Sequence, residues 1–285
     1  MANIRLIRRR IKGIQSTAKI TRAMEMIATS KMRKAQERGL AGRPYAEKIM
    51  QVMADLAALR REGEGMHPLL QKRLVEKIGM LHITPDRGMC GGLNTNINRA
   101  AASFILEQEV PVSLVAVGRK GRDFMRRYGR EIRAEFTNLG DRPSWLDTLP
   151  ISRIIIDDYT SGEIDRVYLV YPQFISTMVQ KPAILQILPV EPAEIPTAQN
   201  VDYIYEPGPA EVLGQLLPRF VEMQVYHAIL ESIASEQSAR MVAMRNATES
   251  ANELIEELTL MYNKARQETI TKELLDITGG AAALA

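Results

Sequence analysis

The sequence predicts an α/β fold class: a long antiparallel coiled coil of the N- and C-terminal helices plus a Rossmann-like, mostly parallel α/β domain. Three observations predict it. Apolar residues at 3–4 spacing run through both ends of the 285-residue chain, the middle alternates strand-like and helix-like segments, and charge is divided unequally among these parts. The expected boundaries are an N-terminal helix at 1–60, a globular domain at 75–205 and a C-terminal helix at 209–285.

The N-terminal segment has the spacing of a coiled-coil helix. Its stripe comprises Ile4, Ile7, Ile11, Ile14 and Ala18, and we expect Ile20, Met24 and Ile27 to continue it on a shifted face. No proline occurs before Pro44, so a helix over 3–38 would run about 54 Å. Gly39, Gly42 and Pro44 can kink it before helical pattern resumes over 45–60.

The N-terminal segment is also strongly basic. Residues 1–60 carry 14 Lys and Arg against 4 Asp and Glu, and no acidic residue precedes Glu25. An organelle transit peptide, a nucleic-acid-binding arm and a helix that packs on a partner all fit this charge. The helix is longer than a transit peptide and continues without a cleavage-like break, which favours packing on a partner.

The C-terminal segment is the longest uninterrupted helical pattern. No proline or glycine occurs from Arg219 to Thr278, which allows about 90 Å of helix. The expected stripe is Met244, Ala247, Ala251, Leu254, Leu258, Met261 and Ala265, with a cap at Gly279-Gly280. Residues 210–285 carry 6 basic and 11 acidic residues, so this helix complements the basic N-terminal one. Antiparallel pairing of the two is the economical solution, and separate homo-oligomers are the alternative.

The middle alternates strands and helices. Strands are expected at 78–84, 112–118, 131–136 and 164–171, helices at 95–108, 119–128 and 151–161, and a strand pair at 174–180 and 183–188 around Lys181-Pro182. This alternation predicts a mostly parallel sheet. The roughly 130 residues suffice for a core.

The Gly-rich turn at 86–94 invites a nucleotide-binding interpretation. Gly88, Gly91 and Gly92 do not have the spacing of either phosphate-binding fingerprint, so a tight turn with Asn94 or Thr95 as helix N-cap is favoured. Cys90 has no histidine near it in sequence, so we expect its thiol to be inert rather than a nucleophile. We expect the basic turn at 118–122 to be solvated rather than an anion site. We expect the acidic pair at 157–158 to lie on a helix surface rather than to form a catalytic dyad.

Composition excludes further classes. No apolar run approaches the ~18–20 residues that span a bilayer. Cys90 is the only cysteine, which excludes an internal disulfide and a cysteine-based metal cluster and indicates a reducing compartment. The three histidines are far apart and lack metal-ligand spacing. We therefore expect no metal and no cofactor.

Several segments, taken together, resemble the gamma subunit of F-type ATP synthases. They are TAKITRAMEMIATSKMRKAQ at 17–36, DRGMCGGLN at 86–94, SEQSARMVAMRNAT at 235–248, YNKARQETITKEL at 262–274 and GGAAAL at 279–284. They cover both ends and the middle in the right order. The rest of the middle is similar to the family mainly in length and α/β pattern.

The resemblance implies a central-stalk rotor that couples ion-driven rotation of the membrane c ring to nucleotide exchange, and that regulates ATPase activity and proton flow. Catalysis would lie on the beta subunits, so the chain itself would not be an enzyme. The implied partners are the alpha and beta subunits of the catalytic ring, the epsilon subunit and the c ring, with no nucleic acid and no direct membrane insertion. The implied location is peripheral, on the cytoplasmic face of a bacterial plasma membrane.

The resemblance also implies three groups of contact residues. Beta-subunit contacts fall on Lys19, Arg22, Met24, Glu25, Arg33, Arg87, Cys90, Arg266 and Gln267. A bearing tip comprises Ile270, Leu274, Ile277 and Leu284, and a foot at the c ring and epsilon subunit comprises Tyr203, Tyr205 and Glu206. Two alternatives stay open, an α/β enzyme that uses the 86–94 loop and a coiled-coil protein that binds nucleic acid through residues 1–43.

Overall fold

The computed structural model describes residues 4–58, 67–190, 206 and 208–284, with the side chains of 43, 46, 47, 53–58 and 280–284 outside the described part. The chain forms two compact units. The first comprises Met1–Ala28 and Arg240–Ala285, and the second comprises Thr29–Ala239. Helices α1 (Ile4–Ala58) and α5 (Pro209–Leu284) each contribute a segment to both units.

The second unit is built on a five-stranded sheet. The strands are β1 (Ile78–Ile83), β2 (Val112–Val117), β3 (Ile132–Phe136), β4 (Arg166–Phe174) and β5 (Gln180–Leu188), in the order β3-β2-β1-β4-β5. β1 is parallel to both β2 and β4, and β2 is parallel to β3. Only β5 is antiparallel, since it returns directly along β4. The sheet is therefore mixed but mostly parallel, and the predicted α/β class is confirmed.

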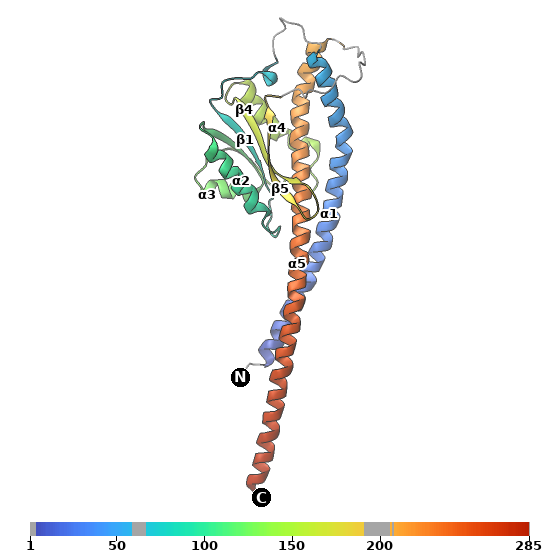
Figure 1. The fold of residues 1–285 in the computed structure, drawn as a ribbon, viewed down its shortest axis with the longest axis vertical. Coiled ribbons are helices and arrows are strands. Elements are labelled where there is room, and N and C mark those ends of the chain that lie inside the picture. The colour runs from blue at the N-terminus through green and yellow to red at the C-terminus, as the bar shows by residue number, and fades with distance from the viewer. Residues whose placement is uncertain (1–3, 59–66, 191–205, 207, 285) are drawn as a thin grey trace. The chain divides into compact units, whose positions relative to one another are not determined.

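Helices cover both faces of this sheet (Figure 1). One core joins α2 (Leu93–Glu107) and α3 (Arg119–Arg127) to the face that carries Met80 and Leu114. The other joins α4 (Trp145–Thr160), a short 3-10 helix (Pro68–Leu70) and the unit's segments of α1 and α5 to the face that carries Leu81. Neighbouring β1 residues thus face different cores, as the period of a strand requires.

The first unit pairs the start of α1 with the distal part of α5. On α1 the residues turned inward are Ile4, Ile7, Ile11, Ile14, Ala18, Thr21 and Ala28; on α5 they are Met244, Ala251, Ile255, Leu258, Tyr262 and Ala265. We call this set the seam. Thr21 Oγ1 lies 2.6 Å from Thr248 Oγ1. Counting outward from this pair in opposite directions places Ile11 opposite Leu258, as in an antiparallel coiled coil.

The seam departs from the expected stripes at two places. Ile20 and Ile27 are 60% and 55% exposed, because α1 keeps its original face through Thr21 and Ala28 instead of shifting. On α5, Leu254 and Met261 are 43% and 54% exposed, and the adjacent Ile255 and Tyr262 are turned inward instead. Adjacent apolar residues satisfy a 3–4 or a 4–3 repeat equally well, so only the position of the partner helix selects one.

The Thr21–Thr248 contact should be measurable as a pairwise coupling. Thr21 is buried, and Thr248 also donates to the Met244 carbonyl at 2.8 Å. We expect Thr21→Val and Thr248→Val to be non-additive by about 1 kcal/mol. Either single change removes the partner across the seam, so the other hydroxyl keeps only its bond to a carbonyl of its own helix, Ala18 for Thr21 and Met244 for Thr248, while the double change removes both hydroxyls. Denaturant unfolding of the four chains of this cycle measures the coupling. Strictly additive losses would show that the hydroxyl contact contributes nothing.

Several expected element boundaries were wrong. The turn before β5 occupies 175–179 rather than Lys181-Pro182; Pro182 lies inside β5, opposite Pro172, where β5 is an edge strand and β4 has passed its last pairing with β1 at Val170. Gly92, not Asn94 or Thr95, is the N-cap of α2. Helix α5 continues through Gly279-Gly280 to Leu284, since glycine costs a helix about 1 kcal/mol without blocking it and AAAL favours helix.

Helix α4 begins six residues earlier than expected, at Trp145 instead of residue 151. Ser144 and Asp147 form a capping box, in which the Ser144 backbone N–H donates to Asp147 Oδ2 at 2.7 Å. The overlooked signal was this Ser-x-x-Asp spacing. Pro150 lies inside this helix, where it removes the amide that would otherwise bond the Leu146 carbonyl.

Candidate functional site

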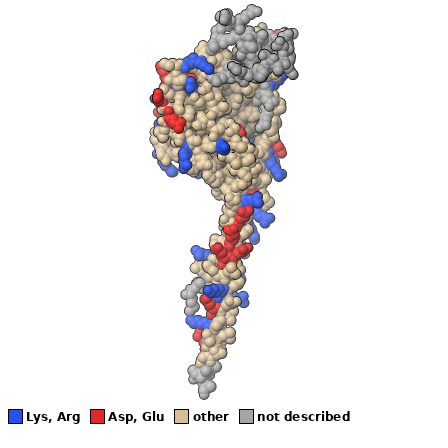
Figure 2. Space-filling model, viewed as in Figure 1, with Lys and Arg blue, Asp and Glu red and all other residues tan. Residues whose placement is uncertain are grey.

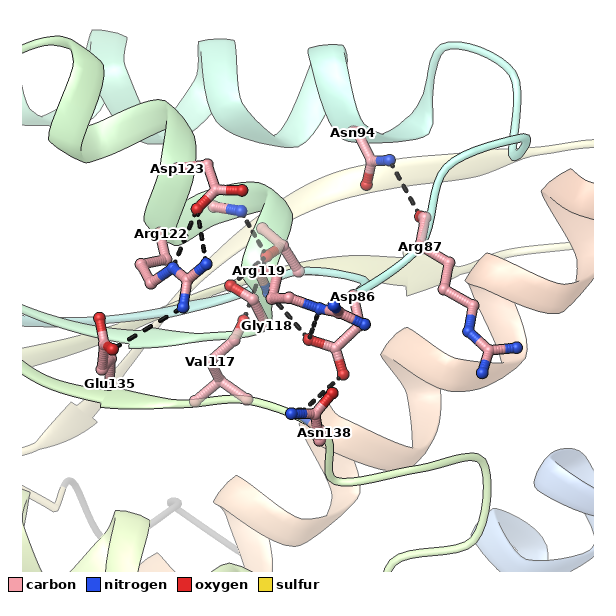
Figure 3. Close-up of polar contacts among 12 residues, drawn as sticks. Asp86, Arg87, Asn94, Val117, Gly118, Arg119, Arg122, Asp123, Glu135 and Asn138 are labelled. Atoms are coloured by element: carbon pink, nitrogen blue, oxygen red, sulfur yellow. Dashed lines mark hydrogen bonds and ion pairs between the residues drawn. The ribbon is translucent and has the colours of Figure 1, made fainter.

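The Gly-rich loop that follows β1 is held by Asp86. Its Oδ1 accepts from the Arg119 backbone N–H at 2.9 Å, and its Oδ2 accepts from the Asn138 backbone N–H at 2.9 Å (Figure 3). These donors follow β2 and β3, so one carboxylate joins the loops after three neighbouring parallel strands. Charge-assisted bonds to backbone N–H groups are among the stronger hydrogen bonds in proteins. Asp86 therefore acts as an anchor for the loop.

Beneath this loop the ends of β1 and β2 pack closely. Gly118 has a φ of 92°, and a Cβ there would lie 1.9 Å from the Thr84 carbonyl oxygen. The Thr84 hydroxyl donates to the Val117 carbonyl at 3.1 Å and accepts from the Gly121 N–H at 2.8 Å. The first amides of α3 are thus used within the domain. The loop's geometry supports the turn interpretation over nucleotide binding.

Two predicted contact residues on this loop have opposite environments. The Arg87 side chain is exposed and points away from the loop in Figure 3, while its carbonyl accepts from Asn94 Nδ2 at 3.4 Å. Cys90 is 1% exposed, and its sulfur lies 3.3 Å from Asn94 Nδ2. The Cys90 side chain therefore faces the domain interior. Met89, which the sequence reasoning missed, is 60% exposed and is the apolar side chain that this loop presents.

A buried histidine lies on β1, the strand that precedes this loop. His82 is fully buried on β1, and neither ring nitrogen has a hydrogen-bond partner among the described residues. Burial lowers its pKa from 6.5 to about 3, because the low-dielectric core disfavours the charged ring. His82 is therefore neutral at physiological pH and belongs to the core.

The predicted contacts on α1 lie on exposed or half-buried faces. Lys19 and Arg22 are exposed in the first unit, and Met24 and Glu25 are half-buried beside the seam. Arg33 is exposed in the second unit. Ile20, Met26 and Ile27 are 60%, 62% and 55% exposed and add apolar surface. Ile20 and Ile27 had been expected in the seam, and Met26 had been overlooked. The exposed face of α1 near these residues is therefore both basic and apolar.

Among the described residues of the first unit, no helix lies beside the distal part of α5. The seam register places Ile4, where α1 begins, opposite Ala265, and Figure 1 shows α5 continuing past the N-terminal end of α1. Arg266 and Gln267 begin this single-helix segment and are exposed. The apolar residues beyond them are also exposed: Ile270 44%, Leu274 57%, Leu275 66% and Ile277 69%. An apolar helix face of this extent fits a partner surface.

The remaining predicted residues are placed only in part. Glu206 is exposed, whereas Tyr203 and Tyr205 lie outside the described residues. Leu284 ends α5, and its side chain lies outside the described part. Figure 2 shows acidic side chains gathered along the α5 segment of the first unit, where Glu249, Glu253, Glu256 and Glu257 are exposed.

Neither a metal cluster nor a membrane span is found in the part of the chain that the structure describes. Within 4–58, 67–190, 206 and 208–284, no three His, Cys, Asp or Glu side chains are grouped closely enough to hold a metal ion. Over the same residues, no helix combines the length and the apolar character needed to cross a membrane.

Most of the predicted site residues that the structure describes thus lie on the surfaces of α1 and α5 or on the loop after β1. Together with two long terminal helices that pair antiparallel and a mixed α/β domain between them in sequence, this arrangement defines the class of coiled-coil stalk proteins.

Comparison with known proteins identifies the family. A family model described as ATP synthase matches residues 3–284. The ATP synthase gamma chain of Dehalococcoides mccartyi is 70% identical over 285 residues, covering all of both chains. That of Herpetosiphon aurantiacus is 50% identical over 293 residues, covering 100% of this chain and 99% of its own. The chain belongs to the ATP synthase gamma chain family.

Solved structures agree at the level of the fold. A chain in the cryo-EM structure of the Euglena gracilis mitochondrial ATP synthase, OSCP/F1/c-ring, matches with a TM-score of 0.67 and 21% identity, over 99% of this chain and 94% of that one. A chain of the rotor from the same organism matches with a TM-score of 0.64 and 20% identity, over 94% and 98%. These likenesses bear out the predicted combination of terminal helices and α/β domain.

Proposed function

We propose that this chain is the central-stalk rotor subunit of a bacterial F-type ATP synthase and couples ion-driven rotation of a c ring to nucleotide exchange in a ring of alpha and beta subunits. The observation that carries the proposal is the 70% identity with a gamma chain along the whole length of both proteins. The chain would sit peripherally at the cytoplasmic face of the plasma membrane, and would bind the epsilon subunit and the c ring through its foot. In this role it modulates ATPase activity and proton flow without catalysing the reaction.

The physical properties of the two units suit a rotor. In the first unit the α5 segment begins beside α1 and ends as a single helix with exposed apolar residues, which suits a tip that turns within an apolar sleeve. The two helices of the seam differ in charge and length, so the axle has no threefold symmetry. An asymmetric axle can hold three chemically identical sites in three different states.

Reconstitution tests the proposal. The purified chain is mixed with alpha and beta subunits of a closely related enzyme, and both complex formation and steady-state ATPase activity are measured. We expect a stoichiometric complex that hydrolyses ATP, and no hydrolysis by the chain alone. Hydrolysis by the pure chain, or failure to join the alpha and beta subunits, would count against the proposal.

The exposed pair at the start of the single-helix segment should affect turnover. We expect Arg266→Leu with Gln267→Leu to lower ATPase turnover of the assembled complex, because a charged hydrogen bond to a ring subunit contributes roughly 1.5–3 kcal/mol. Arg266→Lys should be tolerated in part, since lysine lacks the planar fork of arginine. Turnover is compared with the melting temperature of each isolated variant. Wild-type turnover in the double variant would remove these residues from the proposed contact surface.

The exposed basic side chains should act collectively. Lys19, Arg22, Arg33 and Arg87 are all exposed, and the proposal places them against acidic loops of the beta subunits. Single changes to Gln should have small effects on ATPase and pumping, and the fourfold change a larger and salt-dependent one, because each exposed ion pair is worth only about 0–1 kcal/mol and is screened by salt. Lys12, exposed on the same helix, provides a matched Lys12→Gln control. A flat response across the series would mean that these charges are solvated surface.

A further inference from the structure

One segment of α5 in the second unit is buried and yet polar. Ser232, Ser235, Gln237 and Ser238 are only 4%, 0%, 2% and 0% exposed. Just before them, Val225 and Ile229 face the core as ordinary apolar residues. Burying an amide or a hydroxyl is unfavourable unless it is hydrogen-bonded, so such a segment needs a specific reason.

The first set of contacts joins this segment to the turn between β4 and β5. Ser238 Oγ donates to the Thr177 carbonyl at 2.7 Å and accepts from Gln180 Nε2 at 3.3 Å. Two turns earlier, Glu231 Oε1 accepts from the Phe174 backbone N–H at 3.3 Å. Residues 231 and 238 are seven apart, so they lie on the same face of α5. The end of β4 and the turn after it therefore bond to that face at two levels along α5.

The second set joins the segment to the loop before α4. Gln237 Nε2 donates to Asp141 Oδ1 at 3.2 Å, and Lys31 Nζ on α1 donates to Asp141 Oδ2 at 2.6 Å. One carboxylate thus connects both long helices to the α/β domain. Consecutive helical residues differ by about 100° around the axis, so the hydrogen bonds of Gln237 and Ser238 attach α5 to the domain in two different directions.

We propose that Gln237, Ser238 and Asp141 form a polar key that fixes the rotation of α5 about its own axis and transmits torque between this helix and the α/β domain. The inference rests on the proposed rotor function. Apolar packing also resists rotation of a helix, but it is less directional than hydrogen bonding and defines the rotation angle less sharply. A hydrogen bond is lost after about 1 Å of displacement, which at ~5 Å from the helix axis corresponds to a rotation of roughly 10°.

The experiment compares pumping with hydrolysis in the assembled enzyme. The test variant is Gln237→Leu with Ser238→Ala, and the matched control is Ser235→Ala, which removes a buried hydroxyl that has no partner among the described residues. We expect the test variant to keep its ATPase rate. The number of ions that it pumps per ATP hydrolysed should fall about fivefold for each hydrogen bond that is removed. The control should keep the wild-type ratio. A wild-type ratio of ions pumped to ATP hydrolysed in an assembled test variant would contradict the proposed role of the polar key.

Hydrogen exchange on the chain alone separates the key from the rotor proposal. Ser238→Ala should speed exchange of amides in the 174–180 turn about fivefold relative to Ser235→Ala, since the turn loses its tie to α5. Equal exchange in the two variants would overturn the key even if the double variant fails to assemble. If the wild-type chain supports no pumping, the rotor proposal fails, and the exchange comparison still decides whether the tie exists.

Discussion

Leu258→Pro is expected to abolish ion pumping by the assembled enzyme and to destabilise the first unit by about 3 kcal/mol or more. Leu258 is 7% exposed in the seam, opposite Ile11. Proline there removes the amide that bonds the Leu254 carbonyl, and its ring clashes with that carbonyl, so the helix kinks or breaks. A kinked axle cannot stay centred in a ring.

The control for this change separates helix breakage from loss of burial. Leu258→Ala truncates the same seam residue but preserves the helix, so it should reduce stability while leaving part of the pumping. Leu260→Ala removes a side chain that is 71% exposed and should change little. ATP-driven pumping in vesicles and urea unfolding of each chain measure the two effects. Normal pumping by the proline variant would contradict the placement of Leu258 in a coiled coil that transmits torque.

Acid should destabilise the second unit through His82. The unfolded histidine takes up a proton near pH 6.5, whereas the folded one does so only at about 3. Below pH 6.5 the unfolded state therefore binds more protons, and stability falls with decreasing pH until the folded pKa is reached. The full stability is present above pH 6.5, and its loss should reach about 2 kcal/mol at pH 5.

His82→Leu should flatten this dependence, because an apolar residue fills the buried site without a titrating group. Urea unfolding at pH 7.5 and pH 5.0 measures the change for the wild type and the variant. His67 also has a pKa lowered by burial but is much less buried, so His67→Gln should retain most of the acid-induced loss. An equal pH dependence in wild type and His82→Leu would assign the acid effect to other groups.

The exposed parts of the candidate site were largely predictable from the sequence. Arg87 and Arg266 carry charges that cannot be buried without a partner, so their exposure follows from their chemistry. The burial of Cys90 was not predictable in this way, because a lone thiol is stable inside or outside a domain. Its burial depends on Asn94 and on the close packing of the strand ends, which bring together residues far apart in sequence.

The polar segment of α5 shows the same limit. No pattern in the sequence near Ser235, Gln237 and Ser238 distinguishes a buried polar face of the helix from a solvated one. Their burial depends on the turn after β4 and on Asp141, which approach the helix from 61 and 96 residues away. No local pattern contains that information, because a hydrogen bond between distant residues leaves no period in either segment.

The sequence by itself determined the two long helices, the strand order along the chain and the separation of charge, because backbone propensity and side-chain period act between near neighbours. The tertiary structure decided which of two adjacent apolar residues faces the seam, as with Ile255 over Leu254, and how far α5 extends beyond α1. An α-helix with 3.6 residues per turn offers neighbouring faces of nearly equal apolar character. Only the partner helix, held by Thr21 against Thr248, selects one of them.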